Sequence, residues 1–237
     1  MGFQIEKAIC LCLDKRKDHW EDLENQCSLK GIPFEKYVAG NGKILDPSEY
    51  DYIDDQDPDM VAWAYGNPTD GTLVNHYNAF LCHQRIVQKA KDQKLKNFLM
   101  LEDDAYFTRR YDSVISDVQH HLDSEEFKWD MLYLGWWIGH EGDEWNDGME
   151  QAYTEEGFTA IARVFANIGG LHGVVINHTM YDTLLSVNPV GPIDMQLNHL
   201  YLHGPVKIDS YFMVPKIIHD KGLFSECDQN PNPRNKI

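Results

Sequence analysis

The stretch Asn97–Phe107, with the sequence Asn-Phe-Leu-Met-Leu-Glu-Asp-Asp-Ala-Tyr-Phe, joins an apolar run to a cluster of acids. Four apolar residues, 98–101, are followed at once by Glu102, Asp103 and Asp104. A short apolar run of this kind is typical of a strand that is buried on both faces, as in a parallel sheet. Adjacent carboxylates repel one another and are costly to bury, so they need either water or a cation. The stretch therefore predicts a buried strand that ends at a polar edge of a sheet.

The acids after this strand have two interpretations. In open α/β sheets, ligands bind at the carboxyl ends of the strands. A cluster of oxygen ligands there suits hard cations such as Mg²⁺ or Mn²⁺, which can bridge the two phosphates of a diphosphate. A solvated acidic turn is the alternative, because short motifs also arise by chance.

Composition indicates a globular and acidic protein. The chain has 237 residues, 43% of them hydrophobic and 12% aromatic, which is enough for a sizeable core. The formal net charge of −17 argues against nucleic acid or an anionic membrane as a nonspecific partner. An anionic substrate would fit this charge if cations screen the site, as in a metal–nucleotide complex.

The five cysteines form neither a zinc-binding pattern nor a disulfide framework. Cys10 and Cys12 lie in an apolar run and are expected to be buried thiols, so a reducing compartment is the simpler inference. The first residues lack the apolar segment of a signal peptide, and no apolar run approaches the length of a membrane span. We therefore expect a cytoplasmic protein without a transmembrane segment.

Apolar runs and helical spacing predict a series of strands and helices. Strands are expected at 8–13, 34–38, 98–101, 130–135, 159–166, 206–208 and 211–214, with a glycine-rich entry into another at 169–176. Helices are expected from Asp18 to before Gly31, at 72–91, 113–122 and 178–186, and from Asp194.

Two turns and a tryptophan pair are candidate binding elements, each with a plainer alternative. The basic turn 14–17 could hold a phosphate or a sugar hydroxyl, or it could serve solubility alone. The turn 39–42, Ala-Gly-Asn-Gly, lets the backbone approach a ligand. Trp136 and Trp137 follow a predicted strand and could stack on a sugar, or they could belong to the core.

Two further side chains have both structural and functional interpretations. His83 lies beside the apolar stripe of the predicted helix 72–91, where a histidine is more often a core residue than a ligand. Asp194 precedes a predicted helix and fits an ordinary N-cap. It could also be a carboxylate that faces the site from the second half of the sheet.

In their order along the chain, these pieces resemble glycosyltransferase family 25, the group that includes lipopolysaccharide glycosyltransferases and collagen galactosyltransferase domains. The Leu-Glu-Asp-Asp motif of the family is intact at 101–104, and its Trp-Asp-x-x-Tyr-Leu-Gly strand is intact at 129–135. Its opening Asn-Leu-Asp-Arg-Arg is similar to 12–16, Cys-Leu-Asp-Lys-Arg. Weaker matches lie at 39–42, 78–83, 192–194 and 215–226, and departures at Cys12, His19, Asn78 and Ala79 indicate a divergent member.

The resemblance, which runs from about Ala8 to Glu226, implies the GT-A fold, a Rossmann-like α/β/α sandwich with a mostly parallel central sheet. It implies one such domain over 1–226, and the Asn- and Pro-rich tail 227–237 is expected to be loosely ordered. It also implies a nucleotide-sugar donor, a UDP-sugar by expectation, together with Mn²⁺ or Mg²⁺. The implied activity is an inverting transfer of the sugar to a hydroxyl group on a glycan or a protein.

The resemblance also implies roles for individual residues. Asp104 is the expected metal ligand, with Glu102 or Asp103 contributing directly or through water and His219 as the expected histidine ligand. Asp194 is the expected general base, with Asp143 or Glu144 as substitutes. The expected nucleotide site comprises Leu13, Asp14, Arg16, Ala39, Asn41 and Asp103. The expected sugar-binding residues are His83, Trp136 and Trp137.

Two other functions compete with this one. A nucleotidyl- or phosphotransferase could use a similar sheet, but the chain has no glycine-rich phosphate loop with a lysine. A degenerate glycosyltransferase-like domain could bind carbohydrate or protein without turnover. The intact acids 102–104 disfavour it, because a binding module has little use for carboxylates that repel one another.

Overall fold

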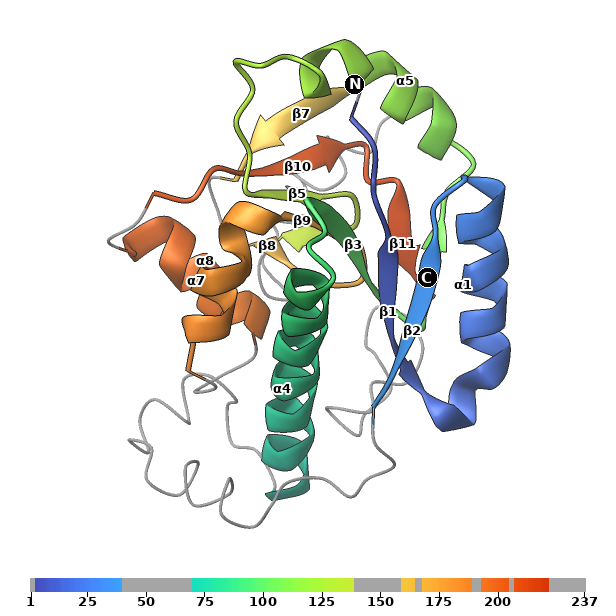
Figure 1. Ribbon diagram of the computed structural model, residues 1–237, viewed down its shortest axis with the longest axis vertical. Helices are drawn as coiled ribbons and strands as arrows, with labels where there is room; N and C mark the ends of the chain where they lie inside the picture. The colour runs from blue at the N-terminus through green and yellow to red at the C-terminus, as the bar shows by residue number, and fades with distance from the viewer. Residues whose placement is uncertain are drawn as a thin grey trace.

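The computed structural model describes residues 3–39, 70–138, 159–164, 168–188, 193–204 and 207–221. In these ranges a seven-stranded sheet lies between two layers of helices (Figure 1). The helices are α1 (Lys17–Leu29), α4 (Asp70–Asp92), α5 (Tyr111–Leu122), α7 (Tyr181–Ser186) and α8 (Ile193–His203), with the 3-10 turns η1 (Asp14–Arg16) and η2 (His178–Met180).

The sheet is mostly parallel. Its strands, in spatial order, are β2 (Phe34–Ala39), β1 (Ala8–Leu13), β3 (Asn97–Glu102), β9 (Val174–Asn177), β5 (Met131–Tyr133), β10 (Ser210–Val214) and β7 (Ala160–Arg163). The pairs β1–β2, β1–β3 and β5–β10 are parallel, whereas β9 and β7 run against their neighbours. All strands of this sheet except β9 and β7 therefore share one direction, which confirms the predicted α/β class.

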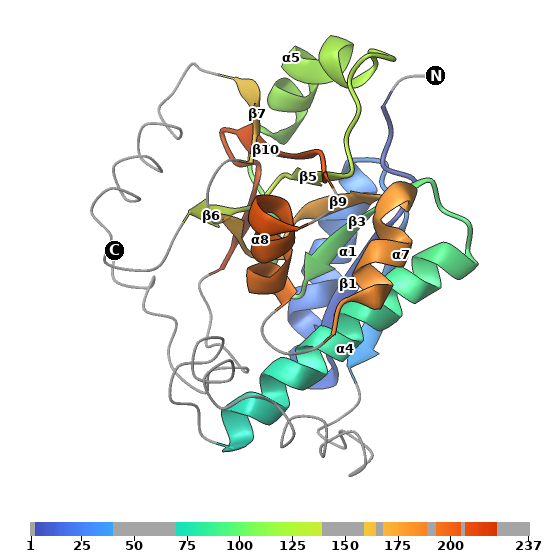
Figure 2. The same ribbon diagram turned by 90° about the vertical axis from the view of Figure 1, so that its left-hand side faces the viewer.

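Side chains of β3 alternate between two hydrophobic cores, as the pleat of a strand requires. Phe98 and Met100 belong to the core beneath α4, α7 and α8, whereas Leu99 and Leu101 belong to the core beneath α1 and α5. Figure 2 shows α4, α7 and α8 in front of the sheet. The two-sided burial of β3 confirms the predicted strand and places Glu102 on the side of α4.

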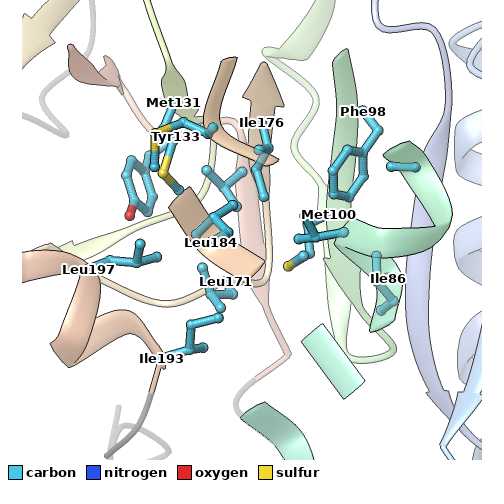
Figure 3. Close-up of a cluster of buried hydrophobic side chains, with 14 of the residues drawn as sticks. Ile86, Phe98, Met100, Met131, Tyr133, Leu171, Ile176, Leu184, Ile193 and Leu197 are labelled. Carbon is cyan, nitrogen blue, oxygen red and sulfur yellow. The ribbon is translucent and has the colours of Figure 1, made fainter. Parts of the chain in front are cut away.

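The core beneath α4, α7 and α8 is drawn in Figure 3. There, helix side chains reach toward side chains of the central strands. The helix residues are Ile86, Leu184, Ile193 and Leu197, and the strand residues are Phe98, Met100, Met131, Tyr133 and Ile176. Burying one such side chain contributes about 1.5–3 kcal/mol, so this core holds the three helices against one face of the sheet.

Several expectations differ from the structure in detail. The strand predicted at 130–135 is shorter, Met131–Tyr133, and Lys207 and Ile208 are not in a strand. Strand β9, which lies next to β3, runs antiparallel to it. An apolar run alone does not reveal this direction. Residues 222–237, including the predicted tail, lie outside the described residues, so the domain boundaries stay a prediction.

The cysteines agree with the expectation of buried thiols. Cys10, Cys12, Cys27 and Cys82 are free and buried, while Cys227 lies outside the described residues. Burial raises the pKa of the Cys27 thiol to about 12, with a smaller contribution from the charge of Glu24. Within the described part of the chain, no helix has both the length and the apolar character needed to cross a membrane.

Candidate functional site

The carboxyl ends of β1, β2 and β3 meet at one edge of the sheet. The parallel register pairs Leu13 with Ala39 and Leu11 with Glu102. Strand β4 (Ala105–Phe107) follows the acids directly and pairs with β11 (Ile218–Asp220). The turn predicted to receive a nucleotide therefore lies beside the acidic turn 102–104, and a late segment of the chain joins them.

Asp103 ties the acidic turn to the end of β1. Its carboxylate Oδ2 accepts a hydrogen bond from the backbone N–H of Leu13 at 2.9 Å, and its Oδ1 accepts one from Arg16 Nη1 at 3.0 Å. Asp103 is only 5% exposed. Both oxygens of this carboxylate are therefore used within the protein.

Glu102 contacts a histidine of α4, the helix that covers its own face of the sheet. His83, which is 3% exposed, places its Nε2 3.3 Å from Glu102 Oε1. Burial alone would raise the pKa of Glu102, but the contact with His83 and the charge of His172 lower it below its ordinary value. The sequence suggested that His83 contacts substrate; in the structure it contacts an acid of the cluster.

Asp104 is the acid of the cluster whose surroundings are mostly negative. Its Oδ1 is buried and has no hydrogen-bond partner among the described residues. Burial, followed by the charges of Glu102, Asp220 and Asp103, raises the pKa of Asp104 to about 7, against the opposing effect of Arg16. A buried acceptor amid like charges is what a bound cation would relieve.

Strand β11 brings a histidine and a further acid to this turn. His219 pairs in register with Tyr106, and their rings are stacked with centroids 5.6 Å apart. Asp220 pairs with Ala105, and its charge raises the pKa of Asp104. His219 was expected from the sequence and Asp220 was not, although the His-Asp dipeptide after an apolar pair was a signal for both.

A second missed residue is His172, which packs against the glycine that ends the Trp-Asp-x-x-Tyr-Leu-Gly motif. A Cβ at Gly135 would lie 2.7 Å from His172 Nε2 and 2.7 Å from the carbonyl oxygen of Ile218. His172 is 5% exposed, and its charge lowers the pKa of Glu102. The bare backbone at Gly135 therefore makes room for a histidine that supports the acidic turn.

Asp194 lies at the start of α8, near the end of β5. Its Oδ2 accepts a hydrogen bond from the backbone N–H of Gly170 at 3.2 Å. Burial, then the contact with Tyr201 and the charge of Asp194, raise the pKa of the Tyr133 hydroxyl. Because β5 and β3 point the same way, Asp194 and Glu102 belong to the same edge of the sheet.

The tryptophan pair divides between the core and the undescribed part of the chain. Trp136 is fully buried, and its Nε1 donates a hydrogen bond to the carbonyl oxygen of Met213 at 2.7 Å. Its ring meets Phe212 edge-on, with centroids 5.1 Å apart. Trp136 therefore fits the core alternative and not the stacking surface. The backbone of Trp137 lies in β6 (Trp137–Ile138), which pairs with β8 (Ile168–Gly169), and its side chain is not described.

Other predicted site residues fall outside the described part. They are the side chain of Asp14 and the residues Asn41, Asp143 and Glu144. In the described ranges, no three His, Cys, Asp or Glu side chains are already arranged to hold a metal ion. The ligand set of Glu102, Asp104 and His219 therefore stays a prediction.

The sequence is similar to two procollagen galactosyltransferases. It is 26% identical over 141 residues to procollagen galactosyltransferase 1 of Danio rerio, covering 57% of this chain and 22% of the relative. It is 21% identical over 137 residues to procollagen galactosyltransferase 2 of Homo sapiens, covering 57% and 21%. The chain is glycosyltransferase-like. It spans less than a quarter of the length of these relatives, and no family model matches it.

Two solved structures have a similar arrangement of the chain. One is a glycosyltransferase involved in the glycosylation of the major capsid of PBCV-1, with 11% identity, 92% of this chain and 94% of that chain covered, and a TM-score of 0.49. The other is the inositol-1-phosphate CTP transferase of T. maritima, with 11% identity, 99% and 92% covered, and a TM-score of 0.47. Neither likeness is strong enough to carry an argument about activity.

Proposed function

We propose that this glycosyltransferase-like chain is a metal-dependent inverting glycosyltransferase. It would move a sugar from a nucleotide-sugar, with a UDP-sugar as the expected donor, to a hydroxyl group on a glycan or a protein. The observation that carries the proposal is Asp104, whose buried Oδ1 has no partner among the described residues and whose pKa is raised to about 7 by burial and by neighbouring acids. The similarity to procollagen galactosyltransferases supports the sugar-transfer part of the proposal.

The residues at this edge fit a hard divalent cation such as Mn²⁺ or Mg²⁺. Asp104 and Glu102 would hold it directly or through water, with His219 of the neighbouring strand β11 as the nitrogen ligand. When bound, such a cation supplies positive charge for the departing diphosphate. The turn Leu13–Arg16 and the facing Ala39 would receive the nucleotide, because they lie beside these acids in the register.

Asp194 is the proposed general base. It would take the proton from the acceptor hydroxyl while the oxygen forms a bond to the anomeric carbon from the face opposite the nucleotide. The bond from that carbon to the diphosphate breaks in the same step, so no covalent enzyme intermediate is needed. The hydrogen bond from Gly170 N–H to Oδ2 orients this carboxylate at the start of α8.

A thermal-unfolding panel tests the metal and nucleotide site. The ligands are UDP, GDP and CMP, each with and without Mn²⁺, and the proteins are the wild type, Asp104→Asn and Asp182→Asn. Asp182 is a matched control because its side chain is 84% exposed on α7 and pairs with a surface lysine, Lys91. A ligand present at a hundred times its Kd stabilises the folded state by about 2.7 kcal/mol. We expect UDP to raise Tm only with Mn²⁺, in the wild type and the control but not in Asp104→Asn.

The same panel identifies the competing function. If no nucleotide raises Tm with any metal, the proposal fails and a non-catalytic binding domain explains the similarity better. If nucleotide binding is confirmed, transfer by Asp194→Asn tests the base. Loss of a general base lowers the rate by about 10²–10⁴-fold, so full activity in this variant would remove Asp194 from the mechanism.

A further inference from the structure

The three acids of the turn differ in how the protein holds them. Asp104 has a buried oxygen without a partner among the described residues, and Glu102 contacts the buried imidazole of His83. Asp103 instead accepts one hydrogen bond on each carboxylate oxygen, from Leu13 N–H and from Arg16 Nη1. Among the described residues, these two donors lie at the end of β1 and in the turn η1 that follows it.

Both partners of Asp103 belong to the segment that would receive the donor nucleotide. Leu13 is the last residue of β1 and pairs with Ala39, and Arg16 ends the 3-10 turn η1. The contact is shielded from water, since the side chains of Arg16 and Asp103 are 15% and 6% exposed. A charged pair with little exposure is screened weakly, so it fixes geometry better than a surface pair does.

We propose that Asp103 is a positioning residue and not a metal ligand. It clamps the turn 13–16 against the acidic turn, so that the nucleotide-binding segment keeps a fixed place relative to Asp104. The part of this inference that concerns the nucleotide rests on the proposed function. The clamp itself does not, because it is formed by the chain alone.

Substitution by asparagine separates the clamp from a ligand role. Asn has nearly the same shape as Asp but presents one acceptor oxygen and one NH₂ donor. In Asp103→Asn, either Leu13 N–H or the guanidinium of Arg16 would therefore face a donor, and one of the two contacts must open. Arg16→Gln provides a second variant, in which Asp103 is intact and the charged partner is removed.

Hydrogen exchange tests the clamp in protein without metal or nucleotide. The measurement is the exchange rate of the Leu13 amide in the wild type, Asp103→Asn, Arg16→Gln and the control Asp182→Asn. Loss of a hydrogen bond to a charged group speeds exchange by about tenfold or more. We expect this increase in Asp103→Asn and a smaller one in Arg16→Gln, with unchanged exchange in α5 and in the control. Unchanged exchange at Leu13 in both variants would overturn the clamp.

Mn²⁺ binding and donor kinetics test what the clamp does for the site. In Asp103→Asn, we expect a Kd for Mn²⁺ within about threefold of wild type and a KM for the donor raised about tenfold, with a smaller change in kcat. If Asp103→Asn loses Mn²⁺ affinity as fully as Asp104→Asn, Asp103 is a metal ligand and the inference is wrong. If the wild type neither binds nucleotide nor transfers sugar, the proposed function fails, and the exchange result still decides the clamp.

Discussion

Residues of α4 contact two carboxylates, Glu35 on β2 and Glu102 in the acidic turn, and the charges around these two places are balanced in opposite ways. On β2, the carboxylate of Glu35 accepts hydrogen bonds from Lys89 Nζ at 2.6 Å, Lys7 Nζ at 2.9 Å and Gln93 Nε2 at 3.0 Å. Burial alone would raise the pKa of Glu35, but these partners lower it to about 2. In the acidic turn, burial and neighbouring acids raise the pKa of Asp104 to about 7.

The contrast separates a carboxylate that stabilises the fold from one whose burial opposes it. Glu35 has more positive partners than its charge requires, and they join the end of α4 to the edge of the sheet. Asp104, by contrast, has a buried oxygen without a partner among the described residues and lies amid like charges, so its burial costs folding free energy. A natural chain keeps such a cost where the group has a task, which is the reason to look for a cation here.

The largest change in stability is expected at Gly135, which packs tightly against His172 and Ile218. In Gly135→Ala, the new Cβ would lie 2.7 Å from the ring of His172 and from the carbonyl oxygen of Ile218. Because the backbone oxygen cannot turn aside, the free energy of unfolding should fall by about 3 kcal/mol in urea denaturation. Gly31→Ala is the comparison, since it adds a Cβ in open space at a φ of 67°, and should cost about 1 kcal/mol. Equal losses in the two variants would contradict the crowding.

A gain of stability is expected next, from removing charge at the acidic turn. In Asp104→Asn, the buried carboxylate becomes neutral and its repulsion by Glu102, Asp220 and Asp103 ends. At mildly alkaline pH and without metal, the free energy of unfolding should rise by about 2 kcal/mol. The same variant should lose Mn²⁺-dependent stabilisation by nucleotide. A destabilised variant would show that Asp104 has a favourable partner in the metal-free protein.

The smallest effect is expected at Glu35, whose charge is balanced by two lysines. A pKa lowered from 4.5 to about 2 means that Glu35 stabilises the folded state fully above pH 4.5 and loses this contribution as pH falls toward 2. Glu35→Gln should therefore lower the free energy of unfolding by about 1 kcal/mol at neutral pH, allowing for solvent screening of a side chain that is 26% exposed. The difference from wild type should shrink in acid. Denaturation series at several pH values measure it, and a difference that grows as pH falls would refute the assignment.

Sequence patterns were sufficient where the signal is local. The run 98–101 predicts a strand buried on both faces because apolar side chains alternate between two cores, and the structure has this strand. The direction of its neighbour β9 was not predictable, since an apolar run reads the same in parallel and antiparallel pairs. Likewise, a tryptophan after a strand fits both core and surface, and only the packing places Trp136 inside.

The site was predictable in its location but not in its internal contacts. Acids that follow a buried strand must lie at the edge of the sheet, so Glu102–Asp104 could be placed from the sequence. Their partners Arg16 and His83 come from distant segments, the first turn and α4, and so does Asp220 of β11, whose charge opposes theirs. Which acid meets which partner depends on the register of the strands, and no local pattern encodes that register.

The pairing of β4 with β11 has a consequence for the order in which the protein can be built. Strand β3 has its two neighbours, β1 and β9, on opposite sides in the sequence, so a chain interrupted before Val174 would leave one apolar edge bare. Bare edges of this kind recruit other chains. His219 and Asp220 can join the acidic turn only after β11, residues 218–220, has been synthesised. On the ribosome, β3 would therefore gain both of its neighbours before the site is complete, and a product truncated before Ile218 would carry the three acids without the strand that completes their surroundings.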